Sequence, residues 1–154
     1  FNAVTPFDGI VFGSMGILIF INTLVLFYMI WTSFTANFNS SKLMQLAVQF
    51  GWIGMLISIV AGQQMLAANG HSVGVPDGGA GIPVTHWSTE GGDWRAVHFL
   101  GMHGIQVLPL LAYFLNKWNF KSSQLVIWVT GVIYVAFIVY IFIKTQAGIP
   151  FLTV

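Results

Sequence analysis

The side chains that could do chemistry gather in one third of this chain. All four histidines lie between residues 71 and 103. The stretch DWRAVHFLGMH, residues 93–103, places an aspartate, an arginine and two histidines in an otherwise apolar segment. A set of histidine and carboxylate ligands suits zinc, iron, copper or manganese, and two histidines can hold a haem. The predicted metal ligands are His71, Asp77, Asp93, His98 and His103, and the predicted contacts of a cofactor such as haem b are His71, His98, His103 and Gln106.

The spacing of His98 and His103 argues against one shared ion. On an ideal helix they lie about 140° and roughly 7.5 Å apart, whereas two helical ligands of one metal are usually four residues apart. Each histidine therefore needs a partner from elsewhere, such as His71, His86 or an acid for His98. The simpler alternative is that each histidine only forms hydrogen bonds inside a polar cavity.

Helix geometry also predicts how this segment is oriented. At 100° per residue, Gly101 and Gly104 fall on the side opposite His98. The polar groups share the other side, namely Arg95, His98, His103 and Gln106. Polar side chains that face lipid are costly, so we expect this side to face the bundle interior or a water-filled cavity.

Asp93 and Arg95 have a structural interpretation as well. Asp93 is expected in the first helical turn, where a negative charge suits the helix dipole. Arg95 can pair with Asp93, Glu90 or Asp77, and its planar fork can hold a carboxylate at two points. Asp93, Arg95 and Glu90 are therefore predicted to form a clamp that holds the preceding loop onto the helices.

The composition predicts the class of protein to which these residues belong. The chain is 56% hydrophobic and only 6% charged, with a mean hydropathy of +0.83, whereas a soluble domain carries about 25% charged residues. It is therefore predicted to be an integral membrane protein, with the lipid bilayer as its surroundings. The absence of cysteine excludes disulfides, iron–sulfur clusters and thiolate zinc sites. A net charge of +1 does not provide the excess positive charge with which proteins bind nucleic acids.

Four apolar segments are long enough to cross a bilayer, which takes roughly 20 helical residues. The predicted fold is an all-α membrane bundle in a single domain, with helices over residues 6–31, 41–68, 93–118 and 123–145. The connection 69–92 holds seven of the 17 glycines and two prolines. Its turn signals and apolar residues predict an ordered, compact loop rather than a floppy linker.

The charges predict an orientation. Lys42, Lys117 and Lys121 lie in two short connections without acids, and all four acids lie at the other membrane face. The positive-inside rule places these lysines in the cytoplasm. The 69–92 loop and both ends of the chain then face outward, although Lys144 and Arg95 do not follow the rule.

The run HSVGVPDGGAGIPVTHWSTEGGDWRAVHFLGMHGIQVLPL, residues 71–110, resembles a pattern in a family of multi-pass bacterial membrane proteins of unassigned function. That pattern is H-x-V-G-x-P-D-G-G, then W-S-T, then G-D-x-R-x-x-H-F-x-G-x-H-x-x-Q-x-x-P. The resemblance implies a bacterial inner membrane and a further part of the protein upstream. It assigns no reaction. His86 matches no fixed position, and the shared residues are His71, Pro76, Asp77, Asp93, Arg95, His98, His103, Gln106 and Pro109.

Three functions follow as hypotheses. The first is an outward-facing polar pocket that binds a metal ion or haem, with redox or hydrolytic chemistry. The second is a non-catalytic structural subunit of a larger membrane complex, with other membrane subunits as partners. The third is proton or ion translocation, which ranks last because the helix has no ionisable group between His103 and Lys117.

Overall fold

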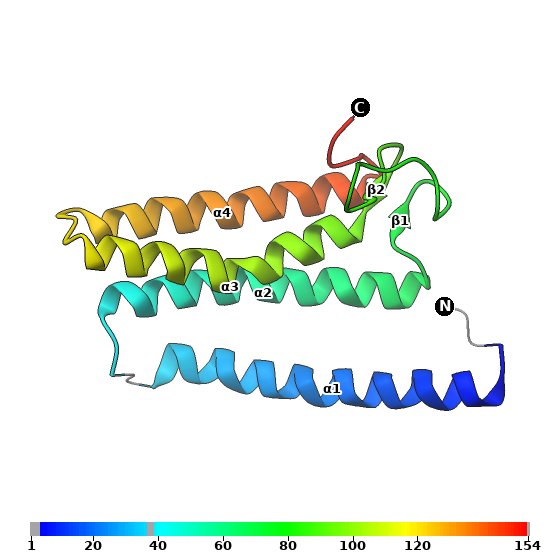
Figure 1. Cartoon of the computed structure of the whole chain (residues 1–154), viewed down its shortest axis with the longest axis horizontal. Coiled ribbons are helices and arrows are strands. Elements are labelled where there is room, and N and C mark those ends of the chain that lie inside the picture. Colours follow the sequence, from blue (N-terminus) through cyan, green and yellow to red (C-terminus); the bar gives the residue numbers. More distant parts are fainter. Residues whose placement is uncertain (1–3, 37–38, 154) are drawn as a thin grey trace. The chain divides into compact units, whose positions relative to one another are not determined.

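Four long helices make up most of the chain (Figure 1). The computed structural model describes residues 4–36 and 39–153. The helices are α1 Pro6–Thr35, α2 Lys42–Ala68, α3 Trp94–Lys117 and α4 Ser123–Gln146. All four are long and apolar enough to cross a membrane. The predicted all-α, multi-pass membrane fold is confirmed.

The helix starts follow from the local sequence. Thr5 caps α1, and Asp8 completes a capping box by accepting the Thr5 backbone N–H at 2.9 Å. Ser41 caps α2 through the backbone N–H of Met44. The predicted bounds differ from the observed ones by four residues at the end of α1 and by one residue or none elsewhere.

Helix α1 forms a compact unit of its own, and residues 40–153 belong to a second unit. Ile30 is the only described residue of α1 that is buried. Apolar side chains cover α1 on every side, as expected of a helix whose surroundings are lipid or other membrane helices.

The second unit packs α2, α3 and α4 side by side (Figure 1), and glycines set the spacing of α2 and α3. A Cβ added to Gly51 would lie 2.7 Å from the Cα of Ile105, and one added to Gly101 would lie 2.7 Å from the Gly54 carbonyl oxygen. The two backbones therefore touch, which is how small residues stabilise helix pairs in lipid.

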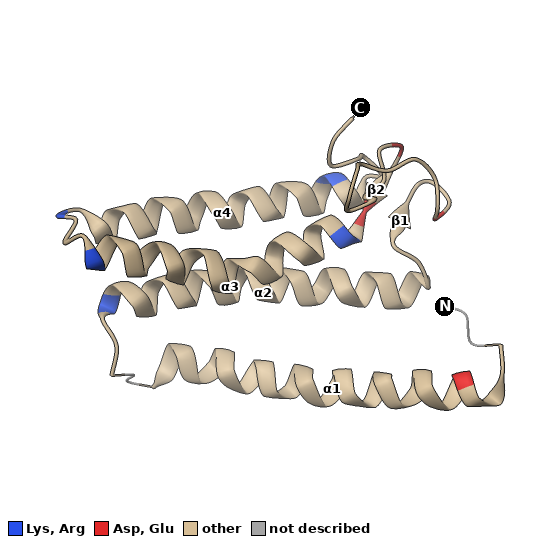
Figure 2. Ribbon diagram, viewed as in Figure 1, with Lys and Arg blue, Asp and Glu red and all other residues tan. Residues whose placement is uncertain are grey.

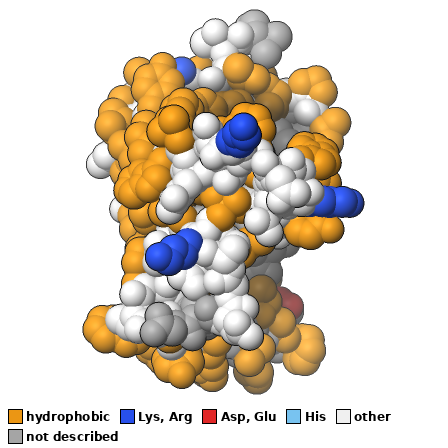
Figure 3. Space-filling view, turned by 90° about the vertical axis from the view of Figure 1, so that its left-hand side faces the viewer, with side chains coloured by type: hydrophobic (Ala, Val, Ile, Leu, Met, Phe, Trp, Pro, Cys, Tyr) orange, Lys and Arg blue, Asp and Glu red, His pale blue; other side chains and the backbone are white. Residues whose placement is uncertain are grey.

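The charged residues of this three-helix unit separate to its two ends (Figure 2). Lys42 begins α2, Lys117 ends α3, and Lys121 lies in the connection to α4. Figure 3 looks onto this end, hereafter the lysine end, where basic groups stand among apolar side chains. The opposite end, hereafter the cap end, carries the acids of this unit together with Arg95 and Lys144.

Candidate functional site

Residues 69–93, hereafter the cap, fold over the cap end as an ordered loop. Strand β1 (Ser72–Val73) pairs antiparallel with β2 (Gly92–Asp93). The Trp94 backbone N–H donates to the His71 carbonyl oxygen at 2.9 Å, so the start of the cap is bonded to the start of α3. Inside the cap, the Ile82 N–H donates to the Trp87 carbonyl oxygen at 2.9 Å. The prediction of an ordered loop is confirmed.

Trp87 anchors the middle of the cap. Its side chain is buried. Its ring makes edge-on contacts with Phe99 of α3 at 5.7 Å and with Phe151 near the C-terminus at 5.5 Å between centroids. Such aromatic contacts add to the stabilisation from burial. The cap is therefore fixed to α3 and to the segment after α4.

Asp93 is the centre of the polar contacts. Its fully buried carboxylate accepts the Ser88 backbone N–H at 2.9 Å, the Arg95 backbone N–H at 2.9 Å and the Arg95 Nη2–H at 2.7 Å. Helix α3 begins at Trp94, so Asp93 is its N-cap residue and not, as predicted, part of its first turn. The cap position explains the difference, since an N-cap carboxylate satisfies a free helical N–H while its own backbone stays extended.

Arg95 also binds the cap segment around His86. Its Nη2 also donates to the His86 carbonyl oxygen at 2.5 Å. Nearby, Val84 and His86 have φ angles of +75° and +52°. Left-handed backbone costs roughly 1–2 kcal/mol for a residue with a side chain, so contacts such as this one have to offset that cost. The predicted Asp93–Arg95 part of the clamp is present.

Glu90 does not join the clamp, contrary to the prediction. Its carboxylate lies beside Gly79, where a Cβ would come within 2.8 Å of Glu90 Oε2. The Ser88 hydroxyl oxygen accepts the backbone N–H groups of Glu90 and Gly91 at 3.3 and 3.1 Å. This turn carries the Glu90 side chain toward Gly79 and leaves Asp93 as the partner of Arg95.

His71 lies between two carboxylates. Its Nδ1 is 3.4 Å from Asp77 Oδ1 and 3.7 Å from Asp93 Oδ2. Asp77 Oδ1 also accepts the Ser72 backbone N–H at 2.8 Å. Burial tends to raise the pKa of Asp77, but hydrogen bonds from Ser72 and the His71 backbone, and the His71 ring, hold that pKa below its usual value.

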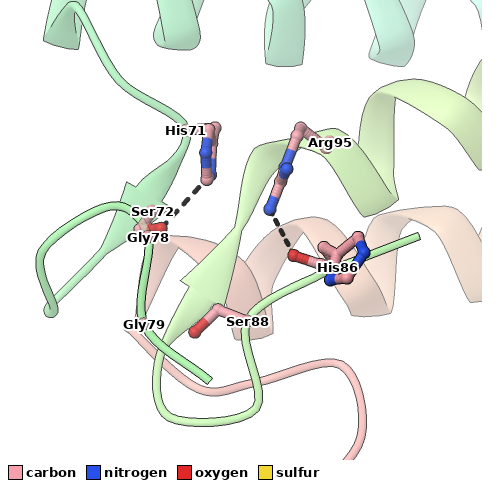
Figure 4. A pocket seen from close by; sticks show the side chains of 7 residues that line it. All are labelled: His71, Ser72, Gly78, Gly79, His86, Ser88 and Arg95. Carbon is pink, nitrogen blue, oxygen red and sulfur yellow. Dashed lines mark hydrogen bonds between the residues drawn. The ribbon is translucent and has the colours of Figure 1, made fainter. Parts of the chain in front are cut away.

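A pocket of about 220 Å³ opens beside these groups (Figure 4). The His71 ring and the Arg95 guanidinium both lie along it, and Gly78, with a φ of +90°, takes a conformation that a side chain would strain. The pocket can hold a small polar molecule that accepts or donates hydrogen bonds. Its lining residues are His71, Ser72, Gly78, Gly79, His86, Ser88 and Arg95.

His98 lies elsewhere, between α2 and α3. Its Nδ1 is 2.8 Å from the Ser58 carbonyl oxygen, and the Ser58 hydroxyl donates to the His98 carbonyl oxygen at 2.8 Å. Ser58 is fully buried. This reciprocal pair links the two helices, so the simpler alternative of a hydrogen-bonded histidine describes His98.

His103 and Gln106 are further down α3. His103 Nδ1 lies 2.6 Å from the Phe99 carbonyl oxygen one turn earlier, and its ring packs on Phe99 with centroids 4.0 Å apart. Gln106 is exposed on the surface of the three-helix unit. Within residues 40–153, Gln106 faces away from α2 and α4, whereas we expected this polar side to face the bundle interior or a water-filled cavity. The glycine side, with Gly101 and Gly104, allows the closer approach and therefore faces the neighbouring helices.

The structure thus does not bring the five predicted metal ligands together. His71, Asp77 and Asp93 meet in the cap, whereas His98 and His103 have partners within the helices. Within residues 4–36 and 39–153, no three His, Asp or Glu side chains are grouped so that they could hold a metal ion. The reason is visible at Asp93, whose oxygens are already occupied by the donors of Ser88 and Arg95.

Several functional contacts come from residues that the sequence analysis did not select. The contact of Ser88 could have been predicted from the sequence, because serine hydroxyls often accept backbone N–H groups two or three residues later. Ser58 lies one turn after Gly54 and thus on the same side of α2, which marks it as facing α3. No sequence pattern indicates the contact of the His86 carbonyl oxygen with Arg95, since the position of this oxygen depends on the whole turn.

Comparison with known protein families, curated proteins and solved structures finds no match.

Proposed function

We propose that this protein is a non-catalytic subunit of a larger assembly in the bacterial inner membrane, with the cap as an outward docking surface. Asp93 carries this proposal. Two backbone N–H groups and the Arg95 guanidinium together occupy both oxygens of this fully buried carboxylate, which supports a structural role. His98 is likewise engaged, as a link between helices.

The charge distribution supports the outward placement of the cap. Lysines occupy the opposite end of the three-helix unit, and the positive-inside rule places that end in the cytoplasm. Cysteine scanning tests the orientation, because the chain has no cysteine of its own. A cysteine at Ser122 should react with membrane-impermeant maleimide only after the membrane is opened, and one at Thr85 should react in intact spheroplasts.

The docking role is tested by breaking the clamp. Arg95→Gln should make the cap sensitive to protease and should shift the protein from a high-mass species to a smaller one on a native gel. Lys144→Gln is the matched control, since it also removes a basic side chain at the cap end, where Lys144 lies over the Tyr140 ring. Retention of the high-mass species after demonstrable loosening of the cap would contradict the docking role.

A second candidate is a bound metal ion or haem, as the clustered histidines first suggested. The observation that favours it is the His71 ring, which lies beside Asp77 along a polar pocket. Elemental analysis and an optical spectrum of the purified protein test it, with His71→Gln as the variant and His103→Gln as the control. Stoichiometric metal or a Soret band that His71→Gln removes would establish it, and their absence from the wild type would dismiss it.

A further inference from the structure

The pocket in the cap contains hydrogen-bond donors that the described chain does not use (Figure 4). Arg95 binds Asp93 and the His86 carbonyl oxygen through Nε and Nη2, so the N–H groups of its Nη1 have no partner within the described chain. The Ser88 hydroxyl oxygen accepts two backbone N–H groups, but its own O–H group has no acceptor among the same residues. Ser88 is only 8% exposed and, like Arg95, lines the pocket. A ligand that accepts hydrogen bonds would therefore satisfy both groups.

A carboxylate without a partner lies at the rim of the same pocket. The carboxylates of Asp77 and Asp93 accept hydrogen bonds inside the cap. The Glu90 carboxylate accepts none from the residues that the structure describes, and Glu90 is exposed. Its Oε2 lies beside Gly79, which itself lines the pocket. The rim therefore offers a negative charge to a ligand that carries a donor group.

The size of the pocket limits the ligand. Its volume of about 220 Å³ corresponds to roughly seven water molecules at about 30 Å³ each. Pockets that hold drug-sized molecules are larger, at about 300–1,000 Å³. A ligand of about seven non-hydrogen atoms therefore fits, which is the size of alanine or serine.

The charges around the pocket disfavour a ligand with two negative charges. Among the described residues that line the pocket, Arg95 is the only arginine or lysine, and it already pairs with Asp93. A second negative charge on the ligand would meet the nearby carboxylates of Asp77 and Glu90, and like charges repel. One carboxylate can take the donors of Arg95 and Ser88, and an ammonium group on the same ligand can neutralise Glu90. The pocket therefore favours a small zwitterion.

We propose that the pocket in the cap binds a free α-amino acid with a small side chain. The carboxylate of this ligand accepts hydrogen bonds from Arg95 Nη1 and the Ser88 hydroxyl, and its ammonium group pairs with Glu90. Helix α1 of the same chain does not offer such a group, because Asp8 is its only charged side chain and already accepts hydrogen bonds from Thr5. This binding site goes beyond the proposed docking role and does not depend on it.

Calorimetric titration of the purified whole chain in detergent tests the proposal with L-alanine, propanoate and L-alaninamide. Propanoate lacks the ammonium group and alaninamide lacks the carboxylate, so each should bind at least about tenfold more weakly than alanine, as expected for the loss of a charged hydrogen bond. Absence of alanine binding at millimolar concentration, or equal binding of propanoate, would overturn the proposal. Tighter binding of glycerophosphoethanolamine would also overturn it, because the pocket would then hold a lipid headgroup.

Glu90→Gln tests the two halves of the ligand separately. It removes the partner of the ammonium group, so alanine should bind about tenfold more weakly while the affinity for propanoate does not fall. Thr89→Val is the matched control, because Thr89 is adjacent in the sequence but does not line the pocket, and it should leave both affinities unchanged. Unchanged protease resistance of the cap shows that both variants fold. Alanine binding that is unaffected by Glu90→Gln would overturn the proposal.

Discussion

In the cap, the Asp93 carboxylate is buried and surrounded by donors from Ser88 and Arg95. Thirteen residues further along the chain, the Gln106 amide lies at the midpoint of α3 with no hydrogen-bond partner within residues 40–153. The Asp93 carboxylate thus has its partners within its own unit, whereas the Gln106 amide does not. Polar side chains in a membrane protein can therefore serve its own fold or an interaction with a neighbour, and their hydrogen bonds tell the two apart.

The largest effect is expected from Asp93→Asn. The amide cannot neutralise Arg95, whose side chain is 33% exposed, and the loss of hydrogen bonds between charged groups should cost about 1.5–3 kcal/mol. The measurement is thermal unfolding in detergent together with digestion by proteinase K, which should cut within residues 69–92. A cap that stays resistant would show that Trp87 and not the clamp holds it.

A smaller effect is expected from Ser58→Ala, which tests a polar contact of α3 that lies inside the unit. It removes the hydroxyl that donates to the His98 carbonyl oxygen but leaves the contact of His98 Nδ1 with the Ser58 carbonyl oxygen. The loss should be about 1 kcal/mol. Ser14→Ala on α1 is the control, because that hydroxyl only donates to Val11 in its own helix. Equal changes in unfolding temperature for the two variants would contradict the link between α2 and α3.

A pH-dependent loosening of the cap should come next. A carboxyl whose pKa is lowered in the folded state stabilises that state above its usual pKa, here 3.8, and loses this contribution as the pH falls through the folded pKa. Protection of the amides of residues 71 and 72 against hydrogen exchange should therefore fall in the wild type as the pH drops below about 4. Asp77→Asn, which lacks the carboxylate, should have lower protection at neutral pH and no such step. A wild-type exchange profile that parallels the variant at every pH would sink this prediction.

The smallest effect is expected from Gln106→Leu on the isolated protein. Because Gln106 has no hydrogen-bond partner within residues 40–153, its replacement should change the unfolding stability of this unit by less than about 0.5 kcal/mol. Thermal unfolding of the purified monomer in detergent measures this. A clear destabilisation would mean that the amide serves the fold of its own chain, and the contrast with Asp93 would disappear.

The sequence predicted local features well. Thr5 and Ser41 marked helix starts correctly because capping depends on a few consecutive residues. The Asp93–Arg95 pair was predicted for the same reason. The orientation of Gln106 was not, because the cost of exposing an amide to lipid does not say which helix satisfies it. The glycines of α3 decided the packing instead. The contact of His98 with Ser58 joins residues 40 positions apart, which no local pattern reveals.

The end of α4 has a consequence for biogenesis. A Cβ on Gly92 would overlap the Thr145 carbonyl oxygen, and one on Gly74 would lie 3.5 Å from the Cα of Gly148. Both strands of the cap therefore pack against the last residues of α4 and those just after it. Because the cap is synthesised before α4, it cannot close until α4 is in place. Closure of the cap therefore indicates that the three-helix unit is fully inserted.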